Sequence, residues 1–466
     1  MTIAMKQQKT TDLTEGSPLR LLVTFTIPLL LGFLFQQFYN MVDTIVVGKF
    51  LGVEALAGVG STGAINFLIL GFCNGVCAGF AIPVAQHFGR KDDRRLRHTV
   101  GNIFWLSLGL ASLLTVTVCL LCHRLLIWMH TPPEALPYAY HYILIIFMGI
   151  PATILYNILS GIIRSLGDSR TPLFFLIFSS ILNIILDLVL IVVIQAGVAG
   201  AAIATVISQI VSGVLCLIYM IGHYPILRMC PEDWKIRRQE CCSLLSMGLP
   251  MGLQYSVTAI GNTILQTSIN CLGPAAMAAV TAAGRIKALM TCPLDAIGTA
   301  AATYTGQNIG AGKLERVNRG TLINFIIGCI YCILPILLTV FWGEQCISLF
   351  LDPNSANRAQ ILAYGKRYLL CNTVNFTALL CVNLFRFSIQ GMGFSGIAVL
   401  AGLLELIGRA AIALLLVPHW DFTAVCAADP CAWFLADLFL IPVYFSSIRK
   451  HREVLTPWPE ANFPEP

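Results

Sequence analysis

Long apolar runs separated by short polar segments fill almost the whole chain. A transmembrane helix needs about 20 mostly apolar residues, and twelve segments satisfy this requirement. They lie at roughly 19–45, 53–83, 99–122, 137–160, 172–194, 198–222, 243–267, 275–306, 320–343, 359–384, 390–418 and 431–448. Pro418, Asp421 and Pro430 interrupt the pattern between the last two segments. The pattern predicts an all-α membrane protein with twelve transmembrane helices.

Lysine and arginine gather in alternate polar segments of this arrangement. The segment 89–97 carries five basic residues, and further basic residues recur at 164–170, 228–238, 313–319 and 449–452. Cytoplasmic loops of membrane proteins are enriched in Lys and Arg. We therefore expect these segments and both termini to face the cytoplasm, with the protein in the cell membrane. An even number of spans is then required, which twelve satisfies.

The two halves of the chain resemble each other. The segment IPLLLGFLFQQFY (27–39) resembles LPMGLQYSVTAIG (249–261), and AQHFGRKDDRRLR (85–97) resembles GQNIGAGKLERVN (306–318). The offset is 221–222 residues, through polar loops as well as apolar runs. Because the matched loops are expected on one side of the membrane, the halves are parallel repeats. Such repeats in secondary transporters place the substrate site between them, near the midplane of the membrane.

The repeat predicts two six-helix lobes around a central cleft. The expected divisions are a first lobe at 1–222, a cytoplasmic linker at 223–240, a second lobe at 241–450 and a cytoplasmic tail at 451–466. Both lobes are present in one chain, so a monomer suffices.

Composition supports the membrane interpretation and excludes several functions. Only 11% of the residues are charged and 57% are hydrophobic, whereas soluble domains are about a quarter charged. The net charge of +6 resides in short loops, so we expect a lipid bilayer rather than a nucleic acid as partner. Neither a nucleotide-binding loop nor a recognisable catalytic motif is present. We therefore expect a transporter driven by an ion gradient, with no enzyme activity and no cofactor.

Polar residues inside the apolar runs of the first half form a candidate ion site. Gln36, Asn40 and Asp43 share one face of a helix, and Asn183 and Asp187 lie one turn apart on another. Further hydroxyls come from Tyr142 and Thr205. Two carboxylates in a poorly hydrated site either share a proton or hold a cation between them. Intramembrane carboxylates are functional by default, so the pattern predicts a coupling site for H⁺ or Na⁺, with Na⁺ held at Asp43, Asn183 and Asp187.

The second half carries a different set of charges. Glu405 and Arg409 are spaced to pair with each other along one helix. Arg285 and Lys287 are further cavity candidates, beside Gln36 and Asn40 of the first half. Being two residues apart, Arg285 and Lys287 do not share a helix face. They either line the cavity, meet a lipid headgroup, or pair with Glu405 or Asp437.

Several of these segments resemble the multidrug and toxic compound extrusion (MATE) transporters. The matching stretches are NMVDTIVVGKFLGVEALAGVG (40–60), PVAQHFGRKD (83–92), IIRSLGDSRTPL (162–173), LNIILDLVLI (182–191) and GVAGAAIATVISQ (197–209). The resemblance implies two six-helix lobes around a cleft. It also implies export of organic, mostly cationic amphipathic compounds in exchange for H⁺ or Na⁺. The alternative is a lipid-linked precursor flippase of the same superfamily, which only Arg285 and Lys287 favour.

The resemblance also implies roles for individual residues. Positions that match the first-lobe coupling site of similar family members are Asp43, Asn183, Asp187, Tyr142 and Thr205. Ser160 stands where some members have an asparagine that helps to ligate the cation. Some members also carry acidic coupling residues in their seventh and tenth helices. Because the corresponding helices of this chain have no Asp or Glu, we do not expect a second coupling site of that type.

Overall fold

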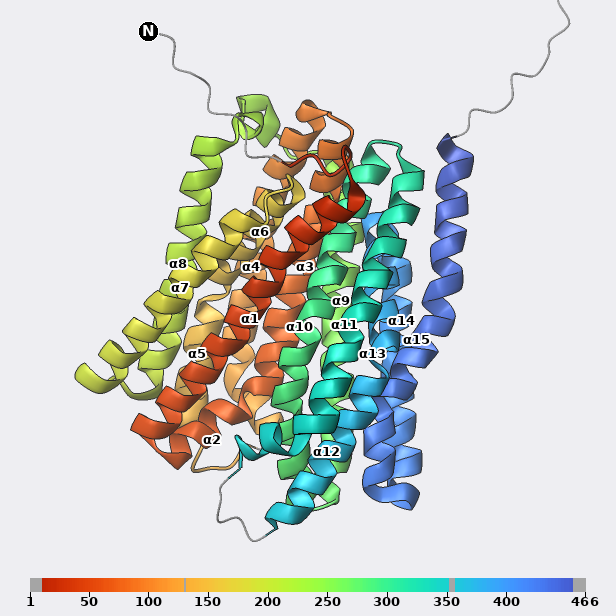
Figure 1. The fold of residues 1–466 in the computed structure, drawn as a ribbon. Helices are drawn as coiled ribbons and strands as arrows, with labels where there is room; N and C mark the ends of the chain where they lie inside the picture. The colour runs from red at the N-terminus through yellow and green to blue at the C-terminus, as the bar shows by residue number, and fades with distance from the viewer. Residues whose placement is uncertain (1–10, 130, 352–356, 456–466) are drawn as a thin grey trace, which may run out of the picture.

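The protein folds into one bundle of helices. The structure is a computed structural model that describes residues 11–129, 131–351 and 357–455, and no strand occurs in these ranges. Figure 1 shows the helices running along a common direction, with the first half of the chain on the left and the second half on the right.

The helices of the first half begin with α1, which has 34 residues. They are α1 (Pro18–Leu51), α2 (Val53–Ser61), α3 (Gly63–Gly89), α4 (Asp93–Trp128), α5 (Leu136–Met148), α6 (Ile150–Ser165), α7 (Arg170–Leu188), η1 (Val189–Val193) and α8 (Gly197–His223). Two short turns of 3₁₀-helix, η2 (Pro225–Leu227) and η3 (Pro231–Trp234), form the connection to the second half.

The second half repeats this order. Its helices are α9 (Arg238–Cys271), α10 (Pro274–Gly310), α11 (Leu314–Ser348), α12 (Arg358–Val374), α13 (Phe376–Gly391), α14 (Ser395–Ala411), η4 (Ile412–Leu416) and α15 (Val417–Leu455). Both η1 and η4 are single π-helical segments. Each half has its own apolar core, one built from side chains between residues 46 and 244 and the other from side chains between 265 and 448.

The twelve expected spans correspond to these elements. By length and composition, seven helical segments of the described residues can cross a membrane, or nine when two bent pairs, α5–α6 (46°) and α12–α13 (48°), count as one span each. One of the seven, Ser395–Glu453, contains two spans, because the backbone leaves the helix at Asp421 (φ 46°). The remaining two spans are α9 and α10, with 34 and 37 residues. Because most of α10 is buried among other helices, it does not need an apolar surface.

The predicted limits of the eleventh and twelfth spans were wrong. The chain continues in α13 to Gly391 and turns at Gly393 (φ 100°), so α14 begins at Ser395 rather than at residue 390. The last two spans are separated at Asp421, and Pro430 lies inside α15. Gly393 tolerates a positive φ that other residues avoid, and this determines where the chain turns.

The outer surface is apolar, as a protein in lipid requires. Leu120, Leu438 and Val193 are large apolar side chains with exposures of 78%, 75% and 74%. In water such side chains would be buried. Together with the long apolar helices, these surfaces describe a multi-pass membrane protein.

The two halves pack along α3 and α9, where Gly75 and Gly79 lie against the backbone of Met251 and Gly248, and they also meet at the end of the bundle that the basic loops predict to be cytoplasmic. Gly89 lies against the backbone carbonyl of Gln307, and Gly310 lies against the carbonyl of Gln86. The two contacts are reciprocal, and each leaves no room for a Cβ atom. Gln86 also donates a hydrogen bond to the carbonyl of Gly391 (2.9 Å). The loops matched by the internal repeat therefore pack on each other across a two-fold-like contact.

A segment before the first helix reinforces this junction. We call residues 11–17 the strap. The backbone N–H of Leu13 donates to Gln307 Oε1 (2.9 Å), Lys313 donates to the carbonyl of Thr14 (2.9 Å), and Arg316 donates to the carbonyl of Gly16 (2.9 Å). The strap thus ties the start of α1 to α10 and α11 of the other half.

Candidate functional site

Asp43 lies within α1 and is partly buried. Its Oδ1 atom is buried and has no hydrogen-bond partner among the described residues. On the same helix, Gln36 hydrogen-bonds the Tyr39 hydroxyl, and Asn40 is exposed. Of the three polar residues expected on one face of this helix, Asp43 is the one with an unsatisfied buried oxygen.

Asp187 occupies the most enclosed position of the predicted set. Its exposure is 0%, and neither carboxylate oxygen has a hydrogen-bond partner in the part of the chain that is described. Asn183, one turn earlier on α7, donates to Thr205 Oγ1 on α8 (3.4 Å), while its own Oδ1 has no partner. Thr205 in turn donates to the carbonyl of Ala201 (3.1 Å). Several acceptor oxygens therefore gather here without donors.

The predicted residues converge from four helices. Asp43 of α1 interacts electrostatically with Asp187 of α7. Tyr142 of α5 is 7% exposed and interacts with both carboxylates. With the Asn183–Thr205 contact between α7 and α8, the structure brings Asp43, Tyr142, Asn183, Asp187 and Thr205 together in the first half.

A small polar cavity adjoins these residues. It has a volume of about 10 Å³, and its lining comprises Tyr39, Leu176, Ser179, Ser180, Asn183, Thr205, Ser208 and Gln209. This is about the space needed by one water molecule. Amide, hydroxyl and carboxylate oxygens suit hard cations and water rather than soft metals. No group of three or more His, Cys, Asp or Glu side chains able to hold a metal is present among the described residues.

The backbone changes its winding directly after Asp187. α7 ends at Leu188, and the π-helical segment η1 follows at once. Single π-turns in α-helices are frequent at functional sites, because they shift side chains relative to a regular helix. The chain then reverses, and α7 and α8 run antiparallel, since Ser179 bonds to Ser208 and Ser212 bonds to Phe175.

In the second half, the predicted pair between Glu405 and Arg409 is confirmed at 3.2 Å. The pair belongs to a larger buried network. Arg386 also binds Glu405, and Arg409 donates from Nε to Asp429 (2.8 Å). Lys287 binds Asp429 (2.6 Å). This network satisfies most of the charge that the second half buries.

Lys287 does not pair with either of its predicted partners. It binds Asp429 of α15 and the hydroxyl of Tyr368 (2.7 Å), rather than Glu405 or Asp437. Arg285 is exposed. Asp437 is 7% exposed and has one buried oxygen without a partner in the described chain.

Two acidic residues of the second half were missed. Asp429 falls between the last two predicted spans, beside Pro430, whereas in the structure both residues lie within α15. Asp295 accepts a hydrogen bond from Asn383 (2.9 Å) and lies in the middle of α10. Asp295 could have been identified from the sequence, because it is a carboxylate within an apolar run, as Asp43 is.

The repeat relates the two charged sites directly. Adding 222 to Asn183 and Asp187 gives Glu405 and Arg409, which lie one turn apart on α14. A π-helical segment follows in both halves, η1 after Asp187 and η4 after Arg409. A guanidinium therefore occupies in one half the position that a carboxylate occupies in the other.

Comparison with known proteins agrees with this two-fold architecture. The MatE family profile matches the chain twice, at residues 28–189 and 250–413. The chain belongs to the MatE family. MatE proteins are membrane transporters, and the two matches begin 222 residues apart (250 − 28), which is the offset of the internal repeat.

Individual relatives cover most of this MatE chain. It is 32% identical over 365 residues to the "Probable multidrug resistance protein YpnP" of Bacillus subtilis (strain 168), covering 78% of this chain and 80% of that protein. It is 23% identical over 356 residues to the "FAD transporter" of Shewanella oneidensis, covering 75% and 77%. Its fold matches a solved outward-facing multidrug resistance MATE transporter with a TM-score of 0.88, at 24% identity, over 96% of this chain and 100% of the other.

Proposed function

We propose that this MatE-family transporter exports organic cations from the cytoplasm in exchange for H⁺ or Na⁺. The observation that carries the proposal is the pair of acidic residues in the first half, Asp43 and Asp187. They come from different helices, interact with each other, and keep buried oxygens without donors. The name of the Bacillus relative, a probable multidrug resistance protein, supports the class of substrate.

The two carboxylates explain the need for a coupling ion. A buried ionised carboxylate without a partner is costly, so the site takes up a proton or a small cation when it closes. The cavity beside Asn183 and Thr205 offers amide and hydroxyl oxygens for the second alternative. Ser160 supplies no amide at the position where some relatives have one, and its hydroxyl already bonds Tyr156.

Ion binding at Asp43 provides a way to move α1. Pro28 lies fifteen residues before Asp43 in the same helix (43 − 28). Proline removes a backbone hydrogen bond and permits a helix to bend. When the charge of Asp43 is neutralised, the part of α1 that follows Pro28 repacks against α7 and α8. The organic cation is then released on the outside. The protein opens to the inside with the coupling ion bound and releases the ion there.

We infer that coupling belongs to the first half alone. Arg409 takes the place of Asp187 in the second half and is held by Glu405 and Asp429. Guanidinium groups stay protonated in proteins, so this position has a fixed positive charge. An exchangeable cation is not needed there.

Of the two basic residues that favour a flippase, Arg285 and Lys287, only one remains available to a substrate. A pyrophosphate site needs cationic side chains directed to the substrate, but Lys287 is engaged by Asp429 and Tyr368. Only Arg285 remains exposed. We therefore retain export of organic cations as the proposed function.

The test uses purified protein in proteoliposomes and ethidium, a fluorescent organic cation. A pH gradient and a Na⁺ gradient are imposed separately on the wild type and on the variants Asp43→Asn and Asp437→Asn. We expect ethidium movement driven by one of the gradients, its loss in Asp43→Asn, and its retention in Asp437→Asn, which removes a buried carboxylate from the other half. Gradient-driven movement that survives in Asp43→Asn would overturn the proposed site.

A further inference from the structure

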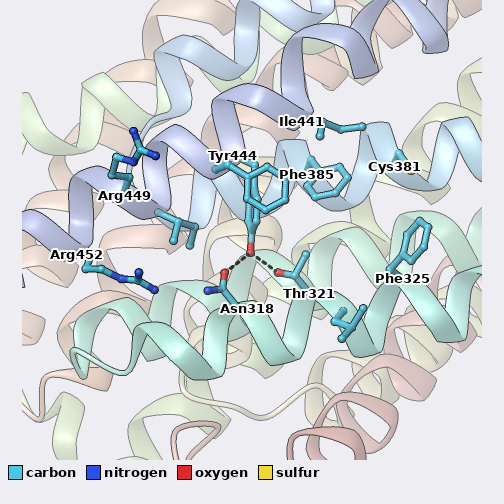
Figure 2. A pocket seen from close by; sticks show the side chains of 12 residues that line it. Asn318, Thr321, Phe325, Cys381, Phe385, Ile441, Tyr444, Arg449 and Arg452 are labelled. Carbon is cyan, nitrogen blue, oxygen red and sulfur yellow. Dashed lines mark hydrogen bonds between the residues drawn. The ribbon is translucent and has the colours of Figure 1, made fainter.

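A groove on the outer surface of the second half is separate from the site described above. It has a volume of about 610 Å³ and lies between α11, α13 and α15 (Figure 2). Its apolar lining comprises Leu322, Phe325, Phe385, Ile441, Phe445 and Ile448. Leu322 and Phe445 are 59% and 62% exposed, so the groove opens to the surroundings of the bundle rather than to its interior.

The two ends of the groove differ in polarity. Figure 2 shows Arg449 and Arg452 at one end and the aromatic ring of Phe325 toward the other. The arginines lie near the end of α15, in the basic segment that is predicted to be cytoplasmic. Between the ends, the Tyr444 hydroxyl hydrogen-bonds Asn318 Oδ1 and Thr321 Oγ1, both at 3.1 Å.

The arrangement of apolar walls and basic residues at one end favours a particular class of ligand. The Tyr444 hydroxyl is satisfied within the protein, so the floor of the groove does not require a polar ligand. The apolar walls favour a hydrocarbon chain, and the arginines favour an anionic group at the membrane surface, because guanidinium groups match phosphate geometry. The guanidinium of Arg449 disfavours an organic cation at this end.

We propose that this groove binds an anionic phospholipid of the cytoplasmic leaflet. The phosphate lies at Arg449 and Arg452, and an acyl chain lies along Leu322, Phe385 and Phe445. Basic pockets between transmembrane helices on the cytoplasmic side are suited to such headgroups. By filling the space between α11 and α15, the lipid stabilises the second half independently of the ion site.

Native mass spectrometry with two lipids tests the proposal. Purified wild type and the variant Arg449→Gln/Arg452→Gln are titrated with palmitoyl-oleoyl phosphatidylglycerol and with the zwitterionic phosphatidylcholine of the same chains. We expect the wild type to bind the anionic lipid more tightly, and the variant to lose about tenfold or more of that affinity, because charge-assisted hydrogen bonds are removed. Equal binding of phosphatidylglycerol by both proteins would overturn the proposal.

Two further variants separate charge from shape. Arg90→Gln/Arg94→Gln removes the same charge from exposed positions between α3 and the first turn of α4, on the same side, and is expected to bind phosphatidylglycerol as the wild type does. Leu322→Trp fills the acyl part of the groove and is expected to weaken both lipids. Circular dichroism in a neutral detergent confirms that each variant is folded.

Other occupants give different results in the same experiment. If ethidium displaces the lipid, the groove is a substrate site and the proposal is wrong. If the arginine variant changes the number of copies in the particle instead of the number of lipids, the groove is an interface between copies and the proposal is also wrong. Because the lipid readout does not use transport, these results are independent of the proposed export function.

Discussion

Asp187 and Arg409 lie 222 residues apart (409 − 187), each followed by a π-helical segment. The carboxylate of Asp187 has no hydrogen-bond donor in the described chain, whereas Arg409 is bound by Glu405 and Asp429. A carboxylate can exchange a proton or a cation, but a guanidinium keeps its charge. We therefore propose that this helix face carries an exchangeable charge in the first half, where the second half carries a fixed charge.

A double-mutant cycle tests whether the second-half charges are structural. Arg409→Gln is expected to cost about 3–5 kcal/mol, because it leaves buried carboxylates with fewer partners. In Glu405→Gln/Arg409→Gln both charges are removed together, so the loss should be smaller than the sum of the single losses by about 0.5–3 kcal/mol. Thermal unfolding in detergent measures each variant.

The control for this cycle is Arg285→Gln, which removes an exposed positive charge from the same half. Exposed positions usually change stability by about 0.5 kcal/mol or less. Strict additivity of the two single losses would contradict a direct interaction between Glu405 and Arg409.

At the level of residues, polar and acidic side chains inside apolar runs could be identified from the sequence. Asp43, Asn183 and Asp187 were recognisable because polar groups are costly in a membrane. The pairing of Lys287 with Asp429 was not predictable, because it joins α10 to α15 across 142 residues of sequence. Local spacing contains no information about such a contact, whereas the Glu405–Arg409 pair follows from helix periodicity.

Among the elements, the strap has the clearest testable role. Lys313 and Arg316 donate to backbone carbonyls of Thr14 and Gly16 and so join α11 to the start of α1. In Lys313→Gln/Arg316→Gln, amide exchange at Leu13 is expected to be about tenfold or more faster, because loss of each such hydrogen bond costs about 1–3 kcal/mol. Hydrogen–deuterium exchange with mass spectrometry measures this change.

Arg319→Gln is the matched control, since Arg319 is an exposed basic residue on the same helix. It should leave exchange in the strap unchanged. Unchanged exchange in Lys313→Gln/Arg316→Gln as well would contradict the role of the strap in joining the two halves.

The hydrophobic pattern is sufficient to predict the membrane spans but not the positions where the chain turns. All twelve spans are helical, since apolar runs of helix length determine them, and the corrections concern their ends and the bends within them. A break between residues 418 and 431 was predicted, but its exact position at Asp421 was not, because it needs a positive φ in a residue other than glycine. The prolines beside it suggested breaks, but Pro430 remains inside a helix.

For the whole molecule, the two halves share an architecture and differ in charge. They are joined by the packing of α3 on α9, by reciprocal loop contacts at one end and by the strap. We propose that only the first half binds a coupling ion. One ion should then be exchanged at the site of Asp43 and Asp187 in each cycle.

The most direct measurement of this claim is ion release when the substrate binds. Ethidium is added to purified protein in weakly buffered detergent solution, and released H⁺ is followed with a pH dye or released Na⁺ with a sodium electrode. We expect release of about one ion per wild-type molecule and none from Asp187→Asn. Undiminished release from Asp187→Asn would place the coupling ion at another site and show that Asp187 does not hold it.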